Sequence, residues 1–224
     1  MLSAHQLLGL DPSHLEAVGA QQLERRCAKA FVAMQAAALA DGIDLQLASG
    51  WRSFERQLAI FNGKASGQRP LQDRHGQACD PLAMSDADLL DAILAWSALP
   101  GTSRHHWGTD LDLYDANALP AAQLKLEPWE YQQGGPNFAL SQWLNRHMSA
   151  YGFYRPYQQA LGGVAPEPWH LSYAPVSAHL LNQFDLSLLE HTLSHSDIKL
   201  KASILAQLPG LVEQYCYRIA APPQ

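Results

Sequence analysis

The chain has 224 residues, of which 47% are hydrophobic and 16% are charged, and its formal net charge at pH 7 is −6. This composition is typical of a globular protein with a substantial core and excludes a largely disordered chain. The negative charge and the lack of a basic run in the sequence argue against nucleic acid as a partner. No apolar stretch approaches the length of a membrane span, so we expect no membrane partner either.

The cysteines and the first residues bear on the cellular compartment. Cys27, Cys79 and Cys216 are widely separated and match neither a zinc finger nor a disulfide framework, which favours a reducing compartment or inert thiols. The first residues contain no basic segment, and their apolar run is interrupted at His5 and Gln6. Because a secretory signal peptide has a different pattern, we expect a cytoplasmic protein. The sequence leaves the oligomeric state open.

Hydrophobic periodicity and capping residues predict most of the secondary structure. Apolar residues at steps of three and four predict helices, and strict alternation predicts strands. After a short capped turn or helix over 1–20, the predicted helices span 21–41, 53–62, 85–99 and 137–151, and the predicted strands span 43–49, 110–114 and short runs after 152 and 170.

Two long polar segments and a helical tail complete the chain. Residues 63–81 and 115–136 predict surface loops of a length that usually indicates a lid or a binding loop. Within the second loop, we expect Trp129 and Tyr131 to form one wall of a cleft. Residues 176–224 have helix-forming sequence without a chemical motif, and we expect them to pack on the same domain.

The first chemical motif is SRHHWGTDLD at residues 103–112. Because side chains alternate along a strand, Asp110 and Asp112 should point to the same face. Two acids on one face beside His105 require either solvent or a cation. An exposed strand edge with solvated aspartates therefore fits this stretch, taken alone, as well as a metal site does.

The second motif, EPWH at residues 167–170, supplies the groups that the first one lacks. A hydrolytic zinc site uses three nitrogen or oxygen ligands, an open position and a nearby carboxylate that takes a proton from water. His105, Asp112 and His170 could be the ligands. Glu167 could be the base.

These two motifs, preceded by SGWRSFERQ at residues 49–57, resemble the bacterial zinc D-alanyl-D-alanine carboxypeptidases. That family includes vancomycin-resistance carboxypeptidases and L,D-carboxypeptidases, and it shares a fold with the hedgehog signalling domain. The three motifs occur in the same order and cover about residues 43–174. The family usually has a small apolar residue where this chain has Asp110. Either acid could reach a metal, but the seven-residue step from His105 favours Asp112.

The resemblance implies a fold and a set of roles. It implies an α+β fold in which a small, mainly antiparallel sheet carries the zinc site, with a catalytic domain over 1–175 and a helical extension over 176–224. One Zn²⁺ would be held by His105, Asp112 and His170, with Glu167 as the base, Arg52 on the substrate's C-terminal carboxylate or on the oxyanion, and Gln57 and Ser103 assisting substrate binding.

The implied reaction is removal of a terminal D-alanine from peptidoglycan stem peptides or muropeptides. A cytoplasmic enzyme would meet tetrapeptides returned by wall turnover, which favours L,D-carboxypeptidase activity. The alternatives are a D,D-carboxypeptidase acting on pentapeptides and a zinc-containing binding module without catalysis; the presence of Glu167 counts against the latter. A purely structural zinc is disfavoured, because closed structural sites use four ligands rich in cysteine.

Overall fold

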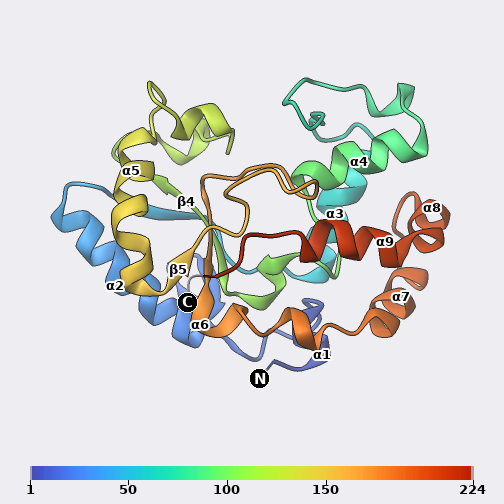
Figure 1. The fold of residues 1–224 in the computed structure, drawn as a ribbon, viewed down its shortest axis with the longest axis horizontal. Helices are drawn as coiled ribbons and strands as arrows, with labels where there is room; N and C mark the ends of the chain where they lie inside the picture. Colours follow the sequence, from blue (N-terminus) through green and yellow to red (C-terminus); the bar gives the residue numbers. More distant parts are fainter. Residues whose placement is uncertain (1, 223–224) are drawn as a thin grey trace.

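The computed structural model describes residues 2–222 and has a four-stranded antiparallel sheet at its centre (Figure 1). The strand order is β3-β4-β6-β5. The strands are β3 (Leu45–Ser49), β4 (Asp110–Asp115), β6 (His170–Tyr173) and β5 (Phe153–Tyr154). The sheet and its covering helices confirm the predicted α+β fold with a small antiparallel sheet.

The central strand β4 brings the three sequence motifs to one end of the sheet. Asp112 lies opposite His170 in the β4–β6 ladder and opposite Ser49 in the β3–β4 ladder. The β3–β4 register shifts between Leu47 and Ser49, as it does at a β-bulge, which redirects the end of a strand. Arg52 therefore follows β3 at the edge where the β4 and β6 motifs meet.

One side of the sheet is covered by α2 (Arg25–Ala40) and α5 (Phe138–His147) (Figure 1). The apolar residues of β4, Leu111 and Leu113, are fully buried in the core between the sheet and these helices. Because alternate residues of a strand face opposite sides, this burial turns Asp110 and Asp112 toward the other side.

A second core cluster lies on the opposite side of the molecule (Figure 1). It is formed by α3 (Phe54–Ala65), α4 (Asp86–Trp96), α7 (Leu186–Ser194), α8 (Lys201–Ala206) and α9 (Leu208–Val212). The helices after residue 176 thus share a core with α3 and α4. The division of the chain at residue 175 stays a prediction.

The N-terminal part differs from the prediction. Residues 21–24 are not the first turn of a helix but form β2 (Gln21–Glu24), which pairs with β1 (Leu15–Val18) in a hairpin. The long helix begins only at Arg25, where the Glu24 carboxylate caps it by accepting hydrogen bonds from two backbone N–H groups. The periodicity of the helix could not reveal this hairpin, since the strand pairing depends on the residues before it.

The remaining elements are short. Ser3 caps α1 (Ala4–Leu7), and α6 (Ala174–Ser177) follows β6. The 3₁₀ turns are Pro81–Ala83, Arg104–Trp107, Ala121–Gln123, Pro128–Tyr131, Met148–Tyr151 and Leu181–Gln183, and a π-helical turn spans Glu213–Tyr217. Within residues 2–222, no helix is both long and apolar enough to cross a bilayer.

Gly108 connects the first motif to the N-terminal hairpin. Its φ is 68°, and a Cβ atom built on it would lie 2.6 Å from Leu15 Cδ2 and 2.7 Å from the backbone nitrogen of Glu24. The Glu24 N–H donates a 2.8 Å hydrogen bond to the Gly108 carbonyl. Both the backbone conformation and the close approach of the hairpin therefore require glycine here.

We predict that Gly108→Ala destabilises the fold more than Gly19→Ala. Gly19 also has a positive φ, 58°, but an added Cβ would meet no atom within 4 Å. In the control, the free energy of unfolding should therefore fall only by the cost of a left-handed backbone at a non-glycine residue, about 1–2 kcal/mol. In Gly108→Ala, the clash with the hairpin should lower it by about a further 1–3 kcal/mol. Urea unfolding midpoints measure both losses. Equal losses would contradict the close packing of the hairpin on Gly108.

Candidate metal centre and active-site pocket

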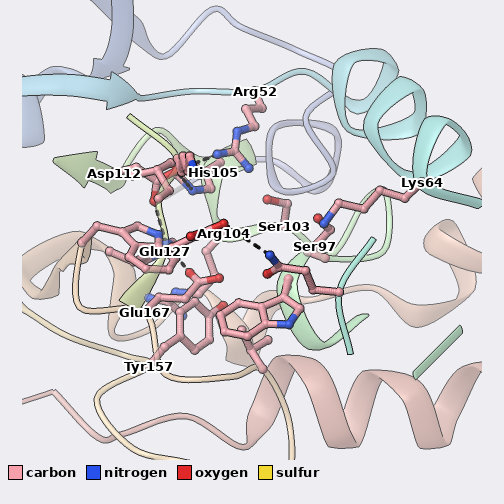
Figure 2. A pocket seen from close by; sticks show the side chains of 18 of the residues that line it. Arg52, Lys64, Ser97, Ser103, Arg104, His105, Asp112, Glu127, Tyr157 and Glu167 are labelled. Carbon is pink, nitrogen blue, oxygen red and sulfur yellow. Dashed lines mark hydrogen bonds and ion pairs between the residues drawn. The ribbon is translucent and has the colours of Figure 1, made fainter. Parts of the chain in front are cut away.

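Three side chains from three elements converge at the end of the sheet (Figure 2). His105 comes from the 3₁₀ turn before β4, Asp112 from β4 and His170 from the first position of β6. All three are buried, and each offers a ligand atom within 4.8 Å of the others. Two imidazole nitrogens and one carboxylate oxygen form a donor set that zinc commonly uses.

Hydrogen bonds on the outer side of each imidazole orient both rings. His105 Nδ1 is 2.8 Å from the Gly50 carbonyl, and His170 Nε2 is 2.9 Å from Asp110 Oδ1. These acceptors assign the ring protons to the outer nitrogens. His105 Nε2 and His170 Nδ1 are left facing Asp112, at 3.3 Å and 3.2 Å from its carboxylate oxygens. This is the arrangement by which outer partners orient the histidine ligands of a metal.

The carboxylate of Asp110 is fully occupied by protein donors. It lies 2.7 Å from Arg104 Nε and 2.7 Å from Thr109 Oγ1, in addition to its contact with His170. Burial alone would raise the pKa of Asp110, but the adjacent Arg104 guanidinium holds that pKa below its ordinary value. Asp110 therefore contacts the outer nitrogen of His170, away from the nitrogen that faces Asp112.

Arg104 is the residue at this centre that sequence reasoning missed. It is buried, and its Nη2 donates a 2.6 Å hydrogen bond to Ser172 Oγ on β6. A signal was present in the sequence, because the resemblance leads us to expect a small apolar residue at position 110, and this chain has an acid there. A buried acid requires a partner, and the arginine six residues earlier supplies it.

The surroundings of Asp112 fit a bound cation. Its Oδ2 accepts a 2.7 Å hydrogen bond from Arg52 Nη2, while its buried Oδ1 has no hydrogen-bond partner in the described part of the chain. Burial opposes the charge of Asp112, but its interactions with His105, His170 and Arg52 hold its pKa well below the ordinary value. Burial likewise opposes the charged form of His170, yet its carboxylate neighbours raise its pKa well above normal. An ionised ligand with an unsatisfied oxygen is well suited to a metal ion.

A cavity of ≈ 590 Å³ opens on this centre (Figure 2). Glu167 lies at its wall, with Oε2 3.3 Å from His170 Nδ1. Arg52 also lines the cavity, and its Nε donates to Ser49 Oγ at 2.9 Å. The two predicted loops contribute Pro70 and Gln72 from one side and residues 125–127 from the other. The cavity therefore brings the three candidate metal ligands together with the Glu167 carboxylate and the Arg52 guanidinium.

The two other predicted binding residues, Ser103 and Gln57, lie in different places relative to the cavity. Ser103 lines the cavity, as a substrate-binding role requires. Gln57 is completely buried beneath the wall, where its Nε2 donates a 2.8 Å hydrogen bond to the carbonyl of Ala98. Ala98 lines the cavity, whereas Gln57 is not among the lining residues within 2–222. The geometry therefore gives Gln57 a supporting contact with the wall instead of a direct place at the substrate.

The expected wall of Trp129 and Tyr131 was wrong. Trp129 is half exposed, and the hydroxyl of Tyr131 donates to the Leu113 carbonyl in the core beneath the sheet. The same loop reaches the cavity two residues earlier, through residues 125–127. The short 3₁₀ turn at Pro128–Tyr131 reverses the chain and directs these aromatic side chains elsewhere.

Comparison with known proteins identifies the family. The family model described as VanY, D-alanyl-D-alanine carboxypeptidase, matches residues 20–176. The chain belongs to this family. An uncharacterised protein of Haemophilus influenzae is 35% identical over 120 residues, which cover 52% of this chain and 92% of that protein. A D-alanyl-D-alanine carboxypeptidase of Enterococcus faecalis is 28% identical over 145 residues, or 63% of this chain and 44% of that protein.

Solved structures of VanY-like proteins share the fold. A mutant of the vancomycin-resistance D,D-pentapeptidase VanY in complex with Zn(II) has a TM-score of 0.53 and 24% identity, covering 75% of this chain and 82% of that one. The LdcB LD-carboxypeptidase has a TM-score of 0.53 and 22% identity, covering 78% of this chain and 75% of that one. At these identities the likeness supports the fold alone.

We predict that Asp112→Ala loses the metal and that Asp110→Asn retains it. Asp112 is the acid that faces both inner imidazole nitrogens, whereas Asp110 orients His170 from outside. The Asp110 variant should still reach about one zinc per chain at saturation, with an affinity about 10–100-fold weaker. Elemental analysis and competition with a chromogenic chelator measure both quantities. Full zinc content in folded Asp112→Ala would contradict the assignment.

Proposed function

We propose that this VanY-family protein is a zinc-dependent carboxypeptidase that removes the C-terminal D-alanine from peptidoglycan stem peptides. The observation that carries the proposal is the convergence of the His105, Asp112 and His170 ligand atoms with Glu167 and Arg52 in one cavity. Family membership supports the peptidase class, and the relatives named above include D,D- and LD-carboxypeptidases.

The residues for one zinc ion would be His105, through Nε2, His170, through Nδ1, and the Asp112 carboxylate. Zinc bound in such a site would act as a Lewis acid and lower the pKa of its bound water to about 7. All three residues line the cavity, so a metal held by them would be accessible to water and substrate. The absence of cysteine from this ligand group is typical of catalytic sites, since structural zinc sites are usually closed by four ligands rich in cysteine.

Glu167 is placed to move the proton of the attacking water. Its carboxylate lies beside the ligand atom of His170 and borders the cavity. As the water oxygen bonds to the scissile carbonyl carbon, the Glu167 carboxylate accepts the proton that the water loses. When the bond between that carbon and the amide nitrogen breaks, Glu167 returns the proton to the leaving amine of D-alanine. One water is consumed, and the products are a shortened peptide and a free amino acid.

Arg52 stabilises negative charge on the substrate. Its guanidinium contacts the Asp112 carboxylate, so its remaining N–H groups lie close to the ligand cluster. From this position Arg52 can donate to the carbonyl oxygen, which becomes negative as water attacks, or to the terminal carboxylate of the substrate. Two N–H donors in a rigid fork serve either purpose better than a lysine ammonium does.

The finer part of the proposal is L,D-carboxypeptidase activity on recycled tetrapeptides. The expected cytoplasmic location, which stays a prediction, favours it. Both a D,D-pentapeptidase and an LD-carboxypeptidase share the fold at the same TM-score of 0.53. D,D-carboxypeptidase activity on pentapeptides is therefore the alternative. A zinc-containing binding module without catalysis is the other, and the position of Glu167 argues against it.

The purified zinc-loaded protein should release D-alanine from a tetrapeptide stem in a panel of tri-, tetra- and pentapeptides. Removal of zinc by a chelator should stop the reaction, and added zinc should restore it. Glu167→Gln should retain fold and zinc while turnover falls by about 10²–10⁴. Mass spectrometry of the products and an assay for free D-alanine measure these effects.

Each outcome of this panel separates two alternatives. D-alanine release from pentapeptide but not from tetrapeptide would replace the L,D specificity with D,D specificity and leave the mechanism intact. Near-normal turnover by Glu167→Gln would show that the base is elsewhere. Stem binding with stoichiometric zinc but no hydrolysis would identify a binding module.

A further inference from the structure

Lys64 enters the active-site cavity from the last turn of α3. The residue lines the cavity, and Figure 2 shows its side chain directed inward on the side where Ser97 and Ser103 lie. The sequence predicts a loop over residues 63–81. Because α3 extends to Ala65 instead, Lys64 is held on a helix at a fixed place in the wall.

No carboxylate among residues 2–222 lies within ion-pairing distance of Lys64 Nζ. The acids of the cavity are engaged with other groups. Asp112 pairs with Arg52, Glu167 lies against His170, and Glu127 accepts hydrogen bonds from the side chains of Gln72 and Trp129. Lys64 is thus a cation in the cavity without an internal counterion.

The environment of Lys64 favours a bound anion. Lys64 is partly buried, and this burial lowers its pKa to about 8. A desolvated ammonium without a partner is costly, and a bound carboxylate offsets that cost. Ser103 adds a hydroxyl that makes no side-chain hydrogen bond within the described part of the chain and lines the same cavity.

The geometry of a peptide substrate requires two separate sites for negative charge. The scissile carbonyl oxygen must lie near the candidate metal ligands. Arg52 is held there, because its Nη2 donates a 2.7 Å hydrogen bond to Asp112 Oδ2. The terminal carboxylate carbon is three bonds further along the chain, about 3–4 Å from the scissile carbon. A second cation, set apart from the ligand cluster, is therefore needed if Arg52 serves the carbonyl oxygen.

We propose that Lys64, with Ser103, binds the free carboxylate of the substrate's C-terminal residue, and that Arg52 faces the scissile carbonyl oxygen. This inference rests on the proposed carboxypeptidase function and assigns its specificity for a free chain end. The ammonium and the hydroxyl donate hydrogen bonds to the two carboxylate oxygens. An amidated chain end carries no negative charge. Its N–H groups would also face the Lys64 ammonium and the Ser103 hydroxyl, which are themselves donors.

The same carboxylate chemistry has a second source in stem peptides. A penultimate residue that is a diaminodicarboxylic acid carries its own carboxylate, whereas lysine at that position carries none. The test therefore compares stems that differ in the terminal group and, separately, in the penultimate side chain.

The decisive measurement is binding affinity in a zinc-loaded Glu167→Gln background, which avoids turnover. Isothermal titration calorimetry gives Kd for a tetrapeptide acid and its C-terminal amide, each with lysine or diaminopimelate as the penultimate residue. With Lys64 present, the acid should bind about 10–100-fold more tightly than the amide, for both penultimate residues. Lys64→Met should remove most of this preference while the Kd of the amide is unchanged. Lys64→Arg should retain part of it.

Lys125→Met is the matched control, because Lys125 is an exposed lysine that lines the same cavity. It removes the same charge and should preserve the preference for the acid. Loss of the preference in this control, or an equal loss of acid and amide binding in Lys64→Met, would overturn the inference. An effect of Lys64→Met restricted to diaminopimelate stems would instead assign the contact to the penultimate side chain.

The design also separates this inference from the proposed function. A Lys64-dependent preference for the acid, together with no D-alanine release by the protein with Glu167 intact, would contradict catalysis and support the carboxylate site. D-alanine release without a Lys64-dependent preference would support catalysis and overturn the role of Lys64. Failure of any stem to bind would overturn both.

Discussion

The pairing of β4 with β6 is the constraint on which the active centre depends. It places Asp112 opposite His170 and Asp110 opposite Ser172, so that residues from two distant motifs form one ligand group. A register shift of one residue would turn Asp110 and Asp112 into the core and Leu111 and Leu113 outward. The complete burial of these leucines therefore stabilises the same register that builds the metal centre.

Charges of opposite sign alternate through this centre. Arg104 pairs with Asp110, Asp110 contacts His170, and Asp112 pairs with Arg52 on the far side. A buried ion pair such as Arg104–Asp110 contributes little net stability, because both charges lose their hydration. Its value lies in orientation: Asp110 holds the outer nitrogen of His170 and so determines which nitrogen faces Asp112.

The sequence was sufficient for features with a local signal. Ser53 and Ser85, the first residues of the predicted helices 53–62 and 85–99, cap α3 and α4, and the alternation of residues 110–114 indicates the central strand. The motifs led to the residues that the structure brings together at the cavity, although their roles stay predictions. These features can be predicted from the sequence because capping and alternation depend on residues that are neighbours along the chain.

Features that depend on tertiary contacts were not predictable in the same way. The sequence predicts a helix from residue 21, because Leu23 continues the apolar spacing of α2, but residues 21–24 pair with β1 as strand β2. Gln57 lies in a matching motif, but its position on α3 turns it toward the Ala98 carbonyl under the wall. Lys64 lies in a stretch that reads as a polar loop, and only the full length of α3 reveals that it reaches the cavity.

The most direct test of the account is a crystal structure of the zinc-loaded protein with anomalous scattering measured at the zinc edge. The account predicts one ion, about 2.0–2.2 Å from His105 Nε2, from His170 Nδ1 and from a carboxylate oxygen of Asp112, with its open side toward Glu167. An ion bound through His170 Nε2 and Asp110, or a fully occupied zinc elsewhere with this cluster empty, would contradict it.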